Sequence, residues 1–134
     1  MLKAKKYLIL KKSGNRYKYI DTNDNGLGTL YIFLDDCCRY VDRFRKSIND
    51  STQTGGGGNE TSWTREGNKV IITPDFVDNS YEHAFEATLE ELNCIMDQWE
   101  ELLKKMPEEI VLIRDNTITN DSPVVLKENK LISE

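Results

Sequence analysis

The chain has 134 residues, 38% of them hydrophobic, and a formal net charge of −5, so we expect one domain over residues 1–134 with a modest core. The longest apolar runs are far shorter than the roughly 20 residues that span a bilayer, and the first residues do not follow the pattern of a signal peptide. Three cysteines, two of them adjacent, do not indicate a disulfide framework and are typical of a cytoplasmic protein.

The first third of the chain predicts a β-hairpin, a further strand and a helix. Tyr7–Leu10 and Tyr17–Ile20 are rich in β-forming residues and are separated by turn residues. After a second turn, Thr29–Phe33 has a composition that would extend the same sheet. From about Leu34 to Ile48 apolar residues recur every three or four positions, which predicts an amphipathic helix of about four turns.

The middle of the chain predicts a loop followed by three strands. Residues 50–61 contain four consecutive glycines among polar residues, which predicts a flexible Gly-rich loop. Ser62–Arg65 and Lys69–Thr73 predict a second hairpin, and the alternation of polar and apolar residues over Tyr81–Ala87 predicts a further strand.

The last third predicts a second helix and two strands. Thr88 and Glu91 form a capping box at a helix N-terminus, and Pro107 ends the apolar pattern that follows. Ile110–Ile113 predicts a buried strand with which residues 117–126 can pair. The whole pattern predicts an α+β fold, a mainly antiparallel sheet with two amphipathic helices packed on it.

Charges are segregated along the chain. Residues 1–20 contain seven Lys or Arg and no acid, whereas residues 70–103 contain nine acids and no Lys or Arg. Such asymmetry favours a surface for a charged partner. The alternative is that two solvated faces attract each other within the fold.

The segment from Asp21 to Gly26 matches the first half of an EF-hand loop. Asp21, Asn23 and Asn25 occupy the first, third and fifth positions, but the twelfth position holds Ile32 in place of the usual Glu. A turn rich in Asp, Asn and Gly explains the same residues. Calcium binding is left open, with a simple turn as the favoured interpretation.

No group of residues matches a catalytic motif. His83 is the only histidine, and the four glycines are not followed by the Lys-Ser/Thr of a phosphate-binding loop. Because no metal-binding spacing connects Cys37, Cys38 and Cys94, we interpret them as packing residues. We therefore expect no enzyme activity, no cofactor and no metal site.

The basic hairpin offers a second kind of partner. Its lysines alternate with Tyr7, Tyr17 and Tyr19, as on surfaces that stack single-stranded nucleic acid. The negative net charge opposes binding to phosphates. Binding of nucleic acid or of a small ligand to this hairpin is the alternative function.

Residues 60–115 show a family resemblance. Ser62–Ile72, Thr88–Leu92 and Trp99–Ile113 together resemble small cytoplasmic immunity proteins of bacterial polymorphic and contact-dependent toxin systems. The resemblance implies an acidic, non-enzymatic inhibitor that covers the active site of a basic toxin, commonly a nuclease. It transfers no individual binding residue.

Taken together, these features predict a protein-binding module with an acidic surface that attracts a basic partner, and the resemblance implies that it is such an immunity protein. The acids assigned to this surface come from the expected strand at 81–87 and from the second helix: Glu82, Glu86, Glu90, Asp97, Glu100 and Glu101.

Overall fold

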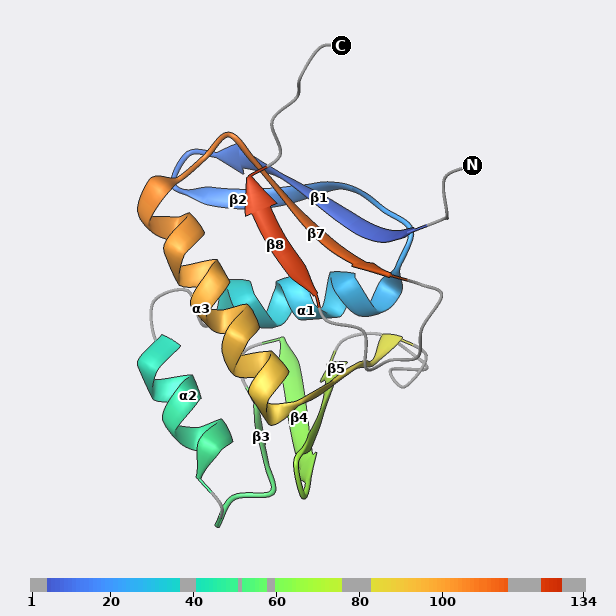
Figure 1. Ribbon diagram of the computed structural model, residues 1–134, viewed down its shortest axis with the longest axis vertical. Helices are drawn as coiled ribbons and strands as arrows, with labels where there is room; N and C mark the ends of the chain where they lie inside the picture. Colours follow the sequence, from blue (N-terminus) through green and yellow to red (C-terminus); the bar gives the residue numbers. More distant parts are fainter. Residues whose placement is uncertain are drawn as a thin grey trace.

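The computed structural model describes residues 5–36, 41–50, 52–57, 60–75, 83–115 and 124–128. Over these residues the chain forms two antiparallel sheets of four strands each, with three helices (Figure 1). The predicted α+β class is therefore confirmed. The strands divide between two sheets, where the sequence pattern indicated one.

The first sheet has the strand order β2-β1-β7-β8. The predicted hairpin is confirmed as β1 (Lys5–Ser13) and β2 (Arg16–Thr22), and the predicted buried strand as β7 (Glu109–Asp115). β8 (Val125–Glu128) pairs antiparallel with β7, as expected for the end of the segment 117–126. Strands β1 and β7, which are far apart in sequence, thus lie side by side at the centre of the sheet.

The second sheet has the strand order β3-β4-β5-β6. The second predicted hairpin is confirmed as β4 (Thr61–Glu66) and β5 (Lys69–Pro74). β6 (Phe85–Thr88) begins later than the predicted strand, whose first two residues lie outside the described residues.

The expected glycine loop is wrong at residues 55–57, which form the edge strand β3 (Gly55–Gly57). Gly56 pairs with Trp63 of β4, and a Cβ atom on Gly56 would lie only 2.9 Å from Nε1 of the Trp63 side chain. Glycine is therefore needed here because the backbone lies directly against the indole, which is a packing role.

The predicted strand at Thr29–Phe33 is also wrong, because these residues lie inside the helix α1 (Asn25–Asp36). The β-forming composition is overridden by tertiary packing. Leu27, Leu30, Phe33 and Leu34 follow helical spacing and are each at most 1% exposed.

The predicted helix over Leu34–Ile48 is only partly confirmed. Leu34 belongs to α1, and the end of the predicted helix forms the shorter α2 (Val41–Asn49), in which Ile48 is fully buried, so the described residues contain three helices where two were predicted. Residues 37–40 lie outside the described residues. α3 (Leu89–Lys105) confirms the capping box: the Thr88 hydroxyl accepts a hydrogen bond from the Glu91 N–H and donates one to the Glu91 carboxylate. Met106, with φ 47°, ends α3.

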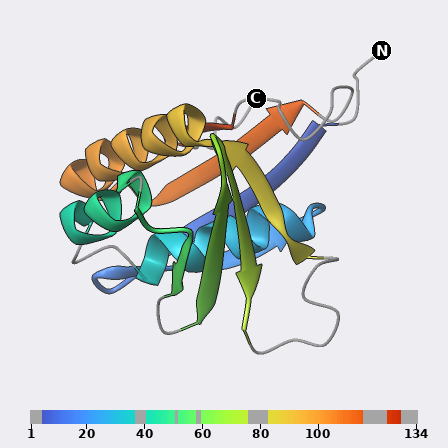
Figure 2. The same cartoon turned by 90° about the horizontal axis from the view of Figure 1, so that it is seen from below.

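Helix α1 is the central layer of the molecule. It contacts β1 and β2 of the first sheet and β4, β5 and β6 of the second. Figure 2 shows α1 between the two sheets, while α2 and α3 lie next to each other at one end. A single cluster of buried side chains joins α1 to both sheets and to α3, and its largest fully buried members are Trp99, Phe33 and Phe85.

One buried ion pair connects the start of α1 to both sheets. The Asp24 carboxylate caps α1 by accepting the Gly26 N–H at 2.9 Å, and it receives Arg114 of β7 at 2.7 Å. The Arg114 guanidinium also lies over the Phe85 ring of β6, 5.4 Å from its centroid. Because Asp24 is 9% and Arg114 12% exposed, removing either partner would leave a largely buried charge unpaired.

Alanine substitutions at two glycines of α1 should have opposite effects on the free energy of unfolding. A Cβ atom on Gly26 would lie 3.0 Å from both the Ala84 carbonyl oxygen and Arg114 Nη2, whereas the nearest atom to one on Gly28 is Leu8 Cδ1 at 4.0 Å. Gly26→Ala should lower the free energy of unfolding by about 1–3 kcal/mol through overpacking. Gly28→Ala should raise it by up to about 1 kcal/mol through helix propensity.

Urea denaturation of the two variants checks this pair of predictions, since the substitution is the same and only the surroundings differ. A loss of stability in Gly28→Ala equal to that in Gly26→Ala would contradict the packing described for α1.

Candidate functional site

The predicted acidic surface is only partly one surface. Glu90, Asp97, Glu100 and Glu101 lie on α3, whereas Glu86 lies on β6 of the second sheet. Glu82 lies outside the described residues. Four of the six predicted residues thus share one helix.

Glu86 is already paired within the fold. Its carboxylate lies 2.7 Å from Nζ of Lys69 on the neighbouring strand β5, and its side chain is 27% exposed. Lys69 immediately precedes residues 70–103 in the sequence. The lack of Lys and Arg within residues 70–103 therefore does not mean that these acids have no cation beside them in the folded protein.

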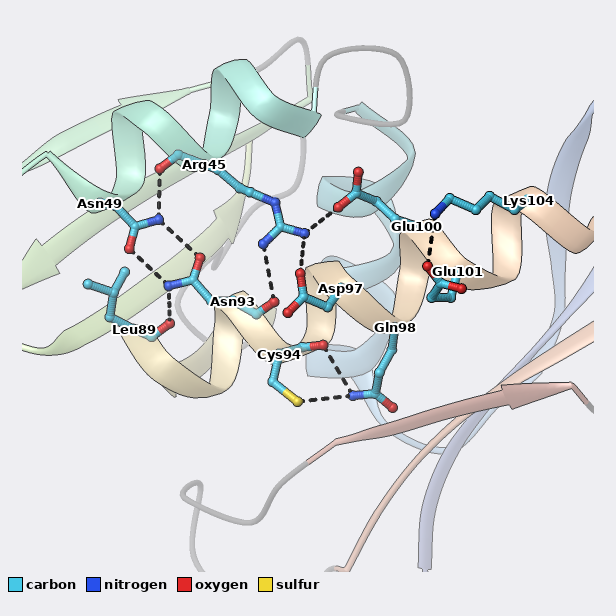
Figure 3. Close-up of polar contacts among 10 residues, drawn as sticks. All are labelled: Arg45, Asn49, Leu89, Asn93, Cys94, Asp97, Gln98, Glu100, Glu101 and Lys104. Carbon is cyan, nitrogen blue, oxygen red and sulfur yellow. Dashed lines mark hydrogen bonds and ion pairs between the residues drawn. The ribbon is translucent and has the colours of Figure 1, made fainter.

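A second cation reaches the acids from α2 (Figure 3). Arg45 contacts Asp97 at 2.7 Å and also pairs with Glu100, both on α3. Burial of the guanidinium acts to lower the pKa of Arg45, but the hydrogen bonds and charges of Glu100 and Asp97 outweigh it and raise that pKa. Arg45, only 21% exposed, joins the two helices.

Two asparagines complete the contact between these helices. The side-chain amides of Asn49 on α2 and Asn93 on α3 donate to each other at 3.0 and 2.9 Å (Figure 3). Each amide also donates to its own helix, Asn49 to the Arg45 carbonyl and Asn93 to the Leu89 carbonyl. These reciprocal hydrogen bonds hold α2 against α3, so that Arg45 lies close enough to pair with Asp97 and Glu100.

The acids that remain open to solvent form a stripe along α3. Glu90, Asp97 and Glu101 are exposed and stand seven and four positions apart, which places them on one face of the helix. The Asp97 and Glu101 side chains are 70% and 68% exposed. We call these three residues the α3 stripe.

Glu101 has a local partner at the C-terminal end of the α3 stripe. The hydrogen bond from Lys104, at 2.9 Å, lowers the pKa of Glu101. A carboxylate with a lowered pKa is ionised at neutral pH, and its pairing is lost only as the pH falls through that lowered value. The pair is highly exposed on both sides, so water and salt screen it.

The basic hairpin is less suited to stack bases than its sequence indicates. Tyr17 is buried, and its hydroxyl donates to the Pro107 carbonyl. Lys11 lies opposite Lys18 on β2 but also opposite Glu109 on β7, which supplies a negative charge beside it. Of the three tyrosines named in the hairpin, Tyr19 is the one with a largely exposed side chain.

The residues of the half EF-hand pattern form hydrogen bonds within the fold. Asp21 accepts a hydrogen bond from the Tyr7 hydroxyl, which raises the pKa of Tyr7, and Asn23 accepts the Tyr7 N–H. Asp24, in the same segment, caps the N-terminus of α1 by accepting a hydrogen bond from the Gly26 N–H. Among the described residues no group of three or more His, Cys, Asp or Glu side chains is arranged to hold a metal ion.

The remaining candidate residues are separated from one another. Cys94 is exposed on α3, so its interpretation as a packing residue is wrong, and Cys37 and Cys38 lie outside the described residues. The His83 carbonyl accepts the Thr29 hydroxyl at 2.6 Å, which ties it to α1. His83 lies beside a cavity considered below.

No family model, no curated protein and no solved structure matches this chain. Within the described part of the chain, no helix combines the length and the apolar composition needed to cross a membrane. The resemblance to immunity proteins therefore stays a prediction.

The α2–α3 contact predicts a measurable coupling. In a double-mutant cycle of Arg45→Ala and Glu100→Ala, followed by urea denaturation, the coupling energy should be about 0.5–1 kcal/mol because the pair is partly shielded from solvent. The matched cycle of Lys104→Ala and Glu101→Ala should give a smaller value, since both side chains are more than two-thirds exposed. Equal coupling in the two cycles would show that Arg45 does not hold the helices together.

Proposed function

We propose that this protein is a non-enzymatic binding module that recognises a basic protein through the α3 stripe. In its specific form the proposal is a cytoplasmic bacterial immunity protein, which neutralises a nuclease-type toxin by masking the active site. The observation that carries the proposal is the row of exposed carboxylates at Glu90, Asp97 and Glu101 on one helix face.

A rigid helix supports such recognition better than a loop. α3 is held by its N-cap, by the buried face that includes Trp99, and by the side-chain contacts to α2. Its acids are therefore placed before the partner arrives, and little conformational entropy is lost on binding. Exposed charges of one sign also accelerate the approach of a partner of opposite sign.

Arg45 and Lys104 reduce the negative charge that the α3 stripe can offer to a partner. Arg45 partly neutralises Asp97, and Lys104 partly neutralises Glu101, while Glu90 has no ion-pair partner among the described residues. The partner's Lys and Arg would have to compete at the first two positions. Glu90 should accordingly be the most sensitive position of the α3 stripe.

Masking follows from the chemistry of nuclease sites. A surface that binds phosphates is positively charged, and the same charge attracts a row of carboxylates. Once α3 lies across such a surface, the substrate backbone is excluded both by volume and by charge. No catalytic step by this chain is needed for the inhibition.

Charge reversal tests the proposal. The double variant Glu90→Lys/Glu101→Lys should reduce affinity for the basic partner at least tenfold, mainly through slower association, as measured by surface plasmon resonance with the partner identified by affinity capture and mass spectrometry. If the partner is a nuclease, stoichiometric wild-type protein should abolish its cleavage of nucleic acid, and the double variant should not.

The matched control is Glu66→Lys/Glu128→Lys, which makes the same change in net charge at exposed positions on β4 and β8. It should retain binding, because only the position of the charges differs. If both double variants lost the same affinity for the partner, the loss would be due to net charge alone. The α3 stripe would then not be the binding surface. Unchanged binding in the first variant would contradict the proposal directly.

A further inference from the structure

An open cavity of about 200 Å³ lies between α1 and the β2 strand of the first sheet. Leu8 of β1, Ile32 of α1 and Pro74 at the end of β5 provide apolar walls. The cavity is separate from the α3 stripe, and its residues come from both sheets and from the helix between them. It is therefore a consequence of how α1 is placed.

A glycine that packing does not require lines this cavity. Gly28 is the fourth residue of α1, and glycine within a helix is less favourable than alanine by up to about 1 kcal/mol. A Cβ atom there would meet only Leu8 Cδ1 at 4.0 Å, whereas Gly26 is crowded by Ala84 and Arg114. The absent side chain at Gly28 leaves space open beside Leu8 in the cavity lining.

The described lining of the cavity contains no permanently charged side chain. Among the described residues that line it, none is Asp, Glu, Lys or Arg. Some of its polar groups are already used: the Thr22 hydroxyl donates to the Tyr7 carbonyl and the Thr29 hydroxyl to the His83 carbonyl. A charged ligand would lose its hydration here without gaining an opposite charge.

Three polar side chains of the lining remain unused. The Tyr19 hydroxyl, the Asn25 amide and the His83 imidazole have no hydrogen-bonding partner among the residues that the structure describes. Tyr19 and Asn25 are exposed and His83 is half-buried. Apolar walls with a few unused donors and acceptors are the usual composition of a small-molecule site.

We propose that this cavity binds a neutral molecule of one aromatic ring that carries a hydrogen-bonding substituent, such as a phenol or an aromatic amide. The size agrees, since a cavity of about 150 Å³ accommodates benzene. The apolar walls receive the ring, and the side chains of Tyr19, Asn25 and His83 bind the substituent. This site is independent of the proposed protein-binding function.

A titration of the full-length protein with p-cresol and with benzamide tests the proposal, monitored by ¹H–¹⁵N NMR. Both should shift the backbone amides of Tyr19, Gly28 and His83, with a dissociation constant on the order of 1 mM or tighter. Benzoate and benzylammonium, which have the same ring but a full charge, should bind at least tenfold more weakly. No shift at these amides with either neutral ligand would overturn the site, and equal binding of benzoate would overturn its neutral chemistry.

A cavity-filling variant locates the binding. Gly28→Leu should abolish the ligand-induced shifts, while Gly28→Ala, which we expect to be at least as stable as the wild type, should weaken binding severalfold. The matched control Lys46→Leu introduces the same side chain at an exposed position of α2 outside the cavity and should bind like the wild type. Wild-type binding in a folded Gly28→Ala together with Gly28→Leu would place the ligand elsewhere and overturn the proposal.

Discussion

The burial of α1 between two antiparallel sheets is the constraint on which the rest of the structure depends. A helix in contact with sheets on two sides must be apolar around much of its circumference, and α1 buries Leu27, Leu30, Phe33 and Leu34. The Asp24–Arg114 pair fixes where this helix begins relative to β7 and β6. The cavity beside Gly28 and the separation of the two sheets both follow from this placement.

The two candidate sites differ in how they relate to that core. The α3 stripe lies on the outer face of a helix whose inner face carries Trp99 and Ile95, so the charges of Glu90 and Glu101 can change without disturbing the packing, whereas Asp97 also pairs with Arg45 of α2. The cavity is part of the packing itself, because its walls belong to α1, β1 and β5. Substitutions of Glu90 and Glu101 should therefore act mainly on binding, whereas those in the cavity affect stability as well.

The pairing of charges shows why a linear count of acids is a poor measure of a surface. Asp97 and Glu100 lie in a stretch without cations, yet Arg45, about fifty positions earlier, reaches both. Lys69 does the same for Glu86. The electrostatic field of α3 is accordingly weaker than its sequence indicates and is concentrated toward Glu90, which has no such partner among the described residues.

Local signals in the sequence determined the elements whose stability is local. The capping box at Thr88, the hairpin of β1 and β2 and the hairpin of β4 and β5 were predictable, because neighbouring residues supply their hydrogen bonds. Only the tertiary structure decided that Thr29–Phe33 is helical and that Gly55–Gly57 is a strand. In the first case burial against two sheets outweighs β propensity, and in the second the strand depends on pairing with β4, where the Trp63 indole leaves no room for a side chain at Gly56. The reach of Arg45 and the cavity beside Gly28 depend on the same long-range packing, which no local pattern encodes.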